Sequence, residues 1–515
     1  MSVEVKNLDH LGLVAGIIDE IGIVEIVNDL LGEKKTEKVS AGLVVKAMIL
    51  NGMGLVSSPL YIFKNFFESK AVENLLGEGI KAEYLNDDRL GRVLDKIYRF
   101  GLNRIFVAIA LATVKKYELT VNSNHLDSSS FHVHGDYPNS GEPGTIEITY
   151  GYSRDHRPDL KQFLMNLICT GDGDVPLWMK MGSGNDSDSK QFGRSMVEFK
   201  KQFQFESLTV ADSAFYTQEN LQIAKEVKWL SRVPVTVKAA KNLVESVEES
   251  ELKASQLPSY RFQESQQNYA DVEQRWLLVE SQKRKESDLK KLEKKIQKDG
   301  EAAQKKLREL SVREFACAAD AEKAAFRLLR KSKYHQITDL EITENSGVYQ
   351  VKANVTIDEV SVEIKKRSAG RFILATNVLN SEELTADSML SNYKEQQSVE
   401  RGFGFLKDPL FLTDSVFLKS PHRIEALGFI MGLCLLVYTL GQRQIRKTLK
   451  RLKTGVKNQL GRLTDRPTLR WIFQCFQGIH VFRTQGVKKI SNLTSERLHL
   501  LEFFPKSCQA YYLLT

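Results

Sequence analysis

Three carboxylates far apart in the chain could act together on a phosphate ester. Asp127 and Asp212 each end a predicted strand, and Glu400 lies on a predicted helix. Such side chains can converge at the carboxyl edge of a sheet, where hard oxygen ligands suit Mg²⁺ or Mn²⁺. Two such ions about 4 Å apart can activate a water molecule and stabilise a leaving oxygen. An aspartate at a strand end also serves as a turn or cap residue, so spacing alone leaves both roles open.

Histidines offer a second, different metal chemistry. His132 and His134 are two residues apart, so they share one face if the segment is a strand. Together with His125 or His156 they could bind zinc, as in a zinc-dependent hydrolase, although no third ligand stands at a motif spacing. The chain contains no P-loop and no complete dinucleotide-binding fingerprint, which argues against an ATP-driven motor.

The elements that must position these residues form a mixed α/β pattern. Residues 1–115 show helical spacing of apolar side chains, with Ser40 as a possible helix cap. From residue 120 the pattern changes to strands, and the sequence Gly171-Asp-Gly-Asp174 predicts a hairpin turn between two of them. A short buried strand at 371–377 and a helical run over about 390–407 come later in the chain.

An insertion separates the two halves of this pattern. Residues 281–310 are rich in Lys, Glu and Gln, and Gly300 divides them into two predicted helices. Residues 347–366 alternate in the manner of strands. We expect the helical hairpin to be mostly a solvated charged face, and a coiled-coil scaffold is the alternative.

The C-terminal part combines an apolar helix with a basic segment. The apolar run Ala426–Leu440 has 15 residues, which is short for a bilayer span and indicates a buried helix. Between Arg443 and Arg470 stand ten basic residues and one acid. One apolar stripe is predicted to turn those cations outward; its members are Ile445, Leu449, Leu452, Val456, Leu460 and Leu463. Such a patch suits a polyanion, with nucleic acid as the first candidate.

Composition sets the broad class. The 515 residues suggest about three domains, with 73 basic and 65 acidic side chains for a net charge of +8. The basic segment alone carries +9, so the rest of the chain sums to about −1. Five dispersed cysteines argue against a disulfide scaffold or a cysteine zinc ribbon. The N-terminus lacks the features of a signal peptide, so we expect a cytoplasmic protein.

An ordered series of motifs along the chain resembles the DDE transposases of bacterial insertion sequences. Within that group the sequence is most similar to the IS-four superfamily, in the branch that has a long insertion before the catalytic glutamate. The resemblance covers about 120–475. Its motifs are His-Leu-Asp127-Ser-Ser-Ser-Phe-His-Val-His-Gly, the segment 151–162, Gly184-Asn-Asp-Ser-Asp188, Ala211-Asp-Ser-Ala-Phe-Tyr216, Leu374-Ala-Thr-Asn377, the set Tyr393, Glu400 and Lys407, and Pro467-Thr-Leu-Arg470.

The resemblance implies an RNase H-like catalytic core with a metal-binding triad of Asp127, Asp212 and Glu400 and two Mg²⁺ or Mn²⁺ ions. Around the glutamate the superfamily pattern is Tyr, Arg, Glu, Lys, and here Gln396 stands where Arg is expected. The resemblance implies that this arginine contacts DNA, and here Lys394 or Arg401 could make the contact instead. The DNA-binding residues expected from the motifs and the basic segment are Tyr393, Lys407, Arg154, Arg157, Lys450, Arg451 and Lys453.

The function implied is a DNA transposase that binds terminal inverted repeats, hydrolyses DNA ends and joins 3′-hydroxyls to target DNA as a homodimer or higher oligomer, in a bacterial cytoplasm near the nucleoid. A catalytically inactive DNA-binding protein and a zinc-dependent hydrolase are the alternatives. The predicted division is a helical domain at 1–115 for DNA binding or dimerisation, core segments at 116–236 and 370–440, an insertion at 237–369 and a basic helical region at 441–515.

Overall fold

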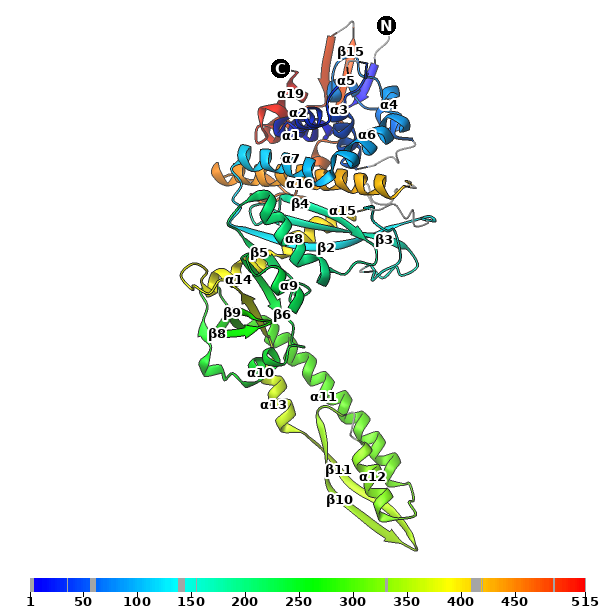
Figure 1. Ribbon diagram of the computed structural model, residues 1–515, viewed down its shortest axis with the longest axis vertical. Coiled ribbons are helices and arrows are strands. Elements are labelled where there is room, and N and C mark those ends of the chain that lie inside the picture. Colours follow the sequence, from blue (N-terminus) through cyan, green and yellow to red (C-terminus); the bar gives the residue numbers. More distant parts are fainter. Residues whose placement is uncertain are drawn as a thin grey trace. The chain divides into compact units, whose positions relative to one another are not determined.

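The computed structural model describes residues 4–34, 36–55, 62–137, 144–153, 155–328, 332–408, 418, 420–484 and 487–514. The chain forms two units (Figure 1). The first unit contains residues 1–229 and 392–515, and the second contains the intervening residues 230–391. Each unit is described by itself below.

The N-terminal part of the first unit is helical, as predicted. Its strand and helices are β1 (Glu4–Asn7), α1 (Leu11–Ile21), α2 (Ile23–Leu31), α3 (Ala41–Gly52), α4 (Phe63–Glu68), α5 (Val72–Leu76), the 3-10 turn Ala82–Tyr84, α6 (Asp87–Phe100) and α7 (Leu102–Tyr117). Ser40 caps α3, since its side chain accepts a hydrogen bond from the Leu43 N–H. Gly22, with φ of 84°, separates α1 from α2.

A mixed sheet follows the helices. Its strands are β2 (Ser123–Val133), β3 (Lys161–Thr170), β4 (Pro176–Ser183) and β5 (Leu208–Ala211), in the order β4-β3-β2-β5. The first three strands are antiparallel, and β5 is parallel to β2. The predicted hairpin turn at 171–174 joins β3 to β4. Three antiparallel strands followed by a strand parallel to the first is the arrangement expected of an RNase H-like core, so the predicted α/β fold is confirmed.

Helices cover both faces of this sheet. The remaining helices and strands of the unit are α8 (Asp188–Phe203), α9 (Gln218–Ile223), α15 (Gln397–Leu406), α16 (Pro421–Arg451), β13 (Val456–Lys457), β14 (Leu463–Thr464), α17 (Leu469–Cys475), β15 (His480–Thr484), β16 (Val487–Ser491), α18 (Ser495–Leu501) and α19 (Lys506–Leu513). α16 packs on Met179 and Met181 of β4 through Gly428 and Gly432, where an added Cβ would lie 2.5 Å from the methionine side chains. α8 lies on the opposite face, where Lys180 pairs with Glu198.

α16 is the core helix of the first unit. In the described part of the chain it is the single helix long and apolar enough to cross a membrane, and the bent pair α6–α7 passes the same test only when taken together. Its apolar stretch is 89% buried inside the protein. This burial confirms the prediction of a buried apolar helix, although the helix begins earlier and ends later than the predicted run.

Both ends of the chain belong to this unit and interlock (Figure 1). β1 pairs with β15, which pairs with β16. α1 packs against α19, since Gly16 lies against Cys508 and the Tyr512 hydroxyl donates to the Asp9 carbonyl at 2.7 Å. The first and last segments therefore form one core.

The second unit is a sheet with a long helical and hairpin extension. Its elements are β6 (Trp229–Val233), α10 (Lys238–Ser246), the 3-10 turn Glu249–Glu251, β7 (Lys253–Ala254), β8 (Tyr260–Tyr269), β9 (Val272–Ser281), α11 (Gln282–Ser311), α12 (Ala318–Leu328), β10 (His335–Asn345), β11 (Val348–Ile357), α13 (Glu359–Ser368), β12 (Arg371–Thr376) and α14 (Ala386–Glu395). Trp229 and the last four residues of α14 belong to the first unit. The strand order is β6-β12-β9-β8-β7.

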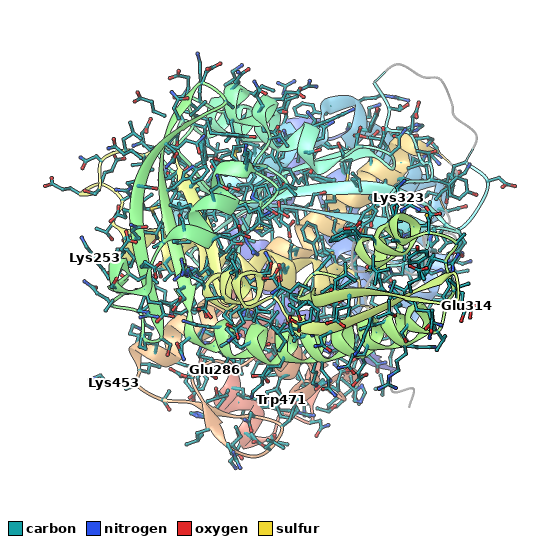
Figure 2. The ribbon with its side chains drawn as sticks, turned by 90° about the horizontal axis from the view of Figure 1, so that it is seen from below. Lys253, Glu286, Glu314, Lys323, Lys453 and Trp471 are labelled. Carbon is teal, nitrogen blue, oxygen red and sulfur yellow. The ribbon has the colours of Figure 1, made fainter. Side chains whose placement is uncertain are left out.

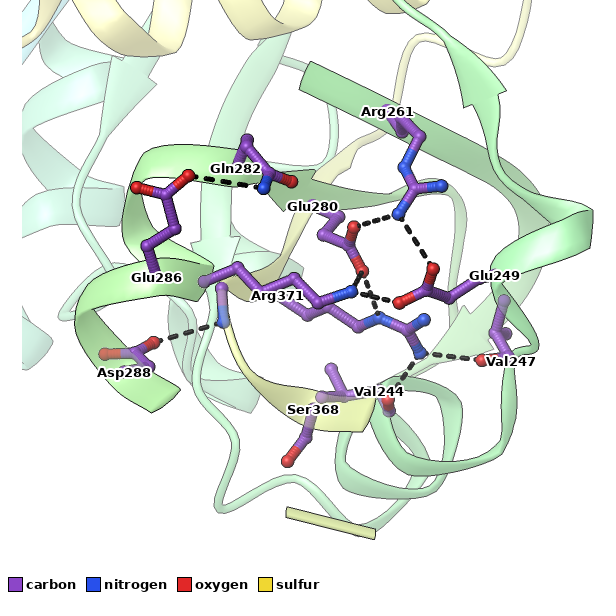
Figure 3. A network of polar contacts seen from close by, with 12 residues as sticks. Val244, Val247, Glu249, Arg261, Glu280, Gln282, Glu286, Asp288, Ser368 and Arg371 are labelled. Atoms are coloured by element: carbon purple, nitrogen blue, oxygen red, sulfur yellow. Dashed lines mark hydrogen bonds and ion pairs between the residues drawn. The ribbon is translucent and has the colours of Figure 1, made fainter. Parts of the chain in front are cut away.

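A buried ion network joins this sheet to the start of α11 (Figure 3). Arg371 on β12 and Glu280 on β9 are almost wholly buried and pair at 3.1 Å. Arg261 on β8 donates to the same carboxylate at 2.5 Å, and Lys285 on α11 approaches it at 3.5 Å. The Gly370 N–H donates to Asp288 of α11 at 3.1 Å. These contacts fix the first turns of α11 on the sheet.

Three local predictions are wrong. Gly300 does not divide α11, which continues through it, because His335 packs where a Cβ would lie. Residues 359–368 form the helix α13 and not a strand, because the Asp358 side chain caps it by accepting from the Ser361 N–H. The predicted stripe over 445–463 ends with α16 at Arg451, and the β13–β14 hairpin follows.

Candidate active site

Asp127 and Asp212 stand side by side on neighbouring parallel strands. Leu126 of β2 pairs with Ala211 of β5, so the two aspartates occupy the next position on each chain. Neighbouring strands are about 4.8 Å apart, and side chains at one level of a parallel pair point to the same face. Both side chains are half-buried. The arrangement places two carboxylates at one point of the sheet.

The backbone around each aspartate holds its carboxylate. The Ser128 N–H donates to Asp127 Oδ1 at 2.7 Å, and the Ala214 N–H donates to Asp212 Oδ1 at 2.9 Å. Asp212 directly follows β5, as predicted. Asp127 lies within β2 and not at its end, because β2 continues to pair with β3 as far as Val133.

α15, which carries Glu400, covers the same face of β2. The rings of Phe403 on α15 and Phe131 on β2 lie 6.4 Å apart. Side chains alternate along a strand, so Phe131 and Asp127 point to one face. Glu400 stands one helical turn before Phe403 and is exposed to solvent. The glutamate and the two aspartates therefore lie on the same side of the sheet.

The direction of α15 places Glu400 towards the part of β2 that carries Asp127. At the C-terminal end of α15, Lys407 Nζ lies 2.7 Å from Asp155 Oδ2 and 5.7 Å from the Phe131 ring centre. Near the middle of α15, Arg401 approaches Asp174 in the β3–β4 turn at 3.8 Å. That turn is hydrogen-bonded to the start of β2. The helix thus runs along β2, with its first turn nearer the start of the strand.

The two aspartates fit a hard divalent cation by donor type, since both offer carboxylate oxygens at one point. Within the described ranges, no three His, Cys, Asp or Glu side chains are gathered closely enough to hold a metal ion.

The histidines make contacts other than the predicted zinc site. His132 Nε2 lies 2.9 Å from Ser153 Oγ, and its Nδ1 lies 3.6 Å from Asp155 Oδ2. Burial lowers the pKa of His132, and Asp155 opposes that shift. His134 follows β2 and is exposed. His125 is completely buried, and burial lowers its pKa to about 4. The described residues give no support to a zinc cluster on His132 and His134.

Gln396 marks a break in the predicted helix at 390–407. α14 ends at Glu395 and α15 begins at Gln397, with Gln396 buried between them. Tyr393 is half-buried on α14, whereas Glu400 lies on α15 and Lys407 directly follows that helix. The single helical run predicted over about 390–407 is therefore divided into two helices at Gln396. α15 itself continues through Gly402 and Gly404.

The other predicted DNA contacts differ in their surroundings. The Arg157 guanidinium donates to both oxygens of Asp159, at 2.9 and 2.8 Å, on an exposed turn. Arg154 lies outside the described residues. Lys450, Arg451 and Lys453 are exposed where α16 ends. Figure 2 shows Lys453 projecting outward.

Part of the basic segment is used inside the protein, which its sequence did not reveal. Arg443 is buried and pairs with Asp172 of the β3–β4 turn at 2.5 Å. Burial alone would raise the pKa of Asp172, but hydrogen bonds from Arg443 and the Thr120 N–H bring it below its usual value.

Arg446 of the basic segment lies within electrostatic range of Arg401 and Asp174. Its side chain donates to the Pro467 carbonyl at 2.9 Å. Burial lowers the pKa of Arg446, and the nearby cations Arg466 and Arg401 lower it further, whereas Asp174 opposes them. Arg401 follows Glu400 on α15. Cations from both segments therefore lie near one another beside the β3–β4 turn.

Comparisons with known proteins agree with this core. The family model described as Transposase DDE domain matches residues 125–440, which contain all three carboxylates. The model described as Domain of unknown function (DUF4277) matches residues 3–111. No curated protein matches the chain.

Among solved structures, the piggyBac transposase synaptic complex with hairpin DNA shows 9% identity and a TM-score of 0.37, over 97% of this chain and 80% of that chain.

Proposed function

The chain belongs to the transposase DDE domain family, and on this premise we propose that it cleaves the ends of a DNA element with metal-activated water and joins the resulting 3′-hydroxyls to target DNA. The observation that carries the proposal is the in-register placement of Asp127 and Asp212 on parallel strands, with α15 and Glu400 over the same face. The substrate would be the terminal inverted repeats of the element, bound by an oligomer of the chain.

Asp127, Asp212 and Glu400 would hold two divalent ions, Mg²⁺ or Mn²⁺. Such ions, when bound, activate a water or hydroxyl nucleophile and stabilise the charge on the leaving oxygen. The backbone N–H groups of Ser128 and Ala214 orient the two aspartates before any ligand arrives. Both chemical steps use an oxygen nucleophile on phosphorus, so one site serves both.

The cations around the carboxylates would bind the DNA backbone. Lys407, which directly follows α15, would exchange its contact with Asp155 for a phosphate, while Phe131 beneath it supports the lysine side chain. Lys450, Arg451 and Lys453 would extend the contact along the exposed end of α16. Tyr393, Arg154 and Arg157 remain proposed DNA contacts on sequence grounds.

The test is incubation of the purified protein with a DNA fragment carrying the inverted repeats that flank its gene, with and without Mg²⁺. We expect free 3′-hydroxyl ends at the repeat edge and, with a target plasmid, joined products. Absence of both nicking and joining would contradict the proposal. Binding without cleavage, unchanged by Asp127→Asn, would instead favour an inactive DNA-binding protein.

A further inference from the structure

The charges of α11 are segregated on one side of the helix. Successive residues of an α-helix are rotated by 100° about its axis. We define the outer stripe of α11 as the positions in an arc about 100° wide, on the side of the helix opposite its apolar residues. Its members are Lys283, Ser287, Lys290, Lys291, Lys294, Lys298, Glu301, Lys305, Arg308 and Glu309. The outer stripe has seven cations and two acids, whereas the rest of the helix has four of each. The whole net charge of +5 on α11 therefore lies on the outer stripe.

Several charges outside the outer stripe are occupied by contacts within the unit. Lys285 pairs with Glu249 and Glu280, and Arg284 lies 3.6 Å from Asp288. Asp299 accepts hydrogen bonds from Ser332 and the Tyr334 N–H. By contrast, all seven cations of the outer stripe are exposed, and within the described ranges none has an ion-pair partner.

The rest of the extension holds α11 in place from its other side. Leu310 packs with Phe315, Ala321, Ala325 and Val351 in a small core formed with α12 and β11. His335 fills the space beside Gly300, so the helix continues without a break. The buried Arg371–Glu280 network anchors the first turns of α11 (Figure 3). Figure 2 shows α11 running between the labelled Glu286 and Glu314.

We propose that the outer stripe of α11 binds the phosphate backbone of duplex DNA, as a surface additional to the carboxylate site and the basic segment. From Lys283 to Arg308 the stripe is about 38 Å long at 1.5 Å per residue. Duplex DNA of that length carries about 20 phosphate charges. Because α11 is held from its other side, its backbone loses little conformational freedom on binding such a polyanion. The outer stripe would be a third DNA surface beside those two, and the inference rests on the proposed function.

The test measures the salt dependence of DNA binding by the full-length protein, with fluorescence anisotropy on a 40-base-pair duplex that lacks the inverted repeats. The stripe variant carries Lys290→Gln, Lys294→Gln and Lys298→Gln. The matched control removes three exposed lysines of the same extension that lie off the stripe, with Lys295→Gln, Lys306→Gln and Lys323→Gln. Exposed Lys→Gln changes on helices leave folding intact, which circular dichroism verifies.

Each phosphate contact contributes about 0.9 to the slope of log affinity against log salt. We expect the stripe variant to flatten this slope by about 2 to 3 and the control variant by less than about 1. Equal slopes in the two variants would overturn the proposal. Loss of binding to phosphatidylserine vesicles in the stripe variant, with an unchanged DNA slope, would overturn it in favour of a membrane surface.

The same experiment separates this inference from the proposed function. If the wild-type protein binds duplex DNA but the stripe variant behaves as the control, the inference fails and the cleavage assay still stands. If the stripe variant flattens the slope but the wild-type protein does not cleave repeat DNA, the stripe is supported and the proposed function fails. A wild-type protein that binds no DNA would overturn both.

Discussion

At the scale of residues, the candidate site depends on Asp127 and Asp212. The sequence predicted that each belongs to a strand, but not the pairing register of β2 and β5 that brings the two side chains to one level. The sequence indicates that Asp212 ends a strand, and β5 does end at Ala211. The pairing of Leu126 with Ala211, which brings Asp127 to the same level, arises from the sheet as a whole. Pairing across 85 residues leaves no local trace in a sequence, so it had to come from the structure.

A metal-rescue experiment tests the role of Asp212. Replacing the carboxylate with a thiol in Asp212→Cys changes a hard oxygen donor into a soft sulfur donor. We expect cleavage in Mg²⁺ to fall by about 1,000-fold, or about 4 kcal/mol in the barrier. Cleavage should recover substantially in Mn²⁺, which accepts sulfur more readily. Asp212→Ala, which has no donor, should not recover, and equal recovery of both variants would contradict metal ligation.

At the scale of elements, a buried ion network joins the first turns of α11 to β9 and β12, and its contribution to stability can be measured. Glu280 is buried against Arg371, so Glu280→Gln leaves a buried guanidinium without its counter-charge. We expect a loss of roughly 3 kcal/mol in the free energy of local opening, seen as about 100-fold faster hydrogen exchange in β9 and β12. Glu286→Gln, at an exposed position four residues into α11, is the control and should change exchange little.

Unchanged protection of β9 and β12 in Glu280→Gln would show that the network in Figure 3 does not stabilise this sheet.

The sequence predicted which segments form helices, strands and turns better than it predicted the residues at which they begin and end. The N-terminal helices, the β3–β4 turn and the buried apolar helix were predictable, because caps, turn residues and apolar periodicity act locally. Gly300 misled the prediction, since the penalty of about 1 kcal/mol for a helical glycine is offset here by the packing of His335. Leu460 and Leu463 continue a helical spacing but are 77% and 74% exposed in a hairpin. The spacing of apolar residues alone does not show whether other parts of the fold bury their side chains.

At the scale of the whole molecule, the two ends of the chain share one core in the first unit. His10 joins them, since its Nε2 lies 2.8 Å from the Met53 carbonyl and its Nδ1 lies 2.7 Å from Gln477 Nε2. With Nε2 as the donor, Nδ1 accepts from the Gln477 amide, which is the neutral form of the ring. No sequence pattern connects residues 10 and 477, so this link was not predictable.

The buried His10 predicts how stability changes with pH. Burial lowers the pKa of His10 from 6.5 to about 4. Between these values the unfolded chain binds a proton that the folded protein does not, so stability is complete above about pH 6.5 and falls as the pH drops towards 4. The full effect is about 3 kcal/mol. Urea unfolding from pH 7 to 4 should show this loss.

His10→Gln, which does not titrate, should flatten the pH dependence, whereas His499→Gln at an exposed position should leave it as in the wild-type protein. An unchanged pH profile in His10→Gln would mean that other groups cause the loss.

The central claim is that Asp127, Asp212 and Glu400 form one metal-dependent site for DNA cleavage, and Glu400 is its most exposed member. The most direct measurement is the Mg²⁺-dependent cleavage rate on repeat-end DNA for Glu400→Gln beside Glu226→Gln, an exposed glutamate of the same unit. We predict a loss of about 1,000-fold for Glu400→Gln, or about 4 kcal/mol, with DNA binding retained, and no more than about a twofold change for Glu226→Gln. Cleavage by Glu400→Gln at the wild-type rate would contradict the account.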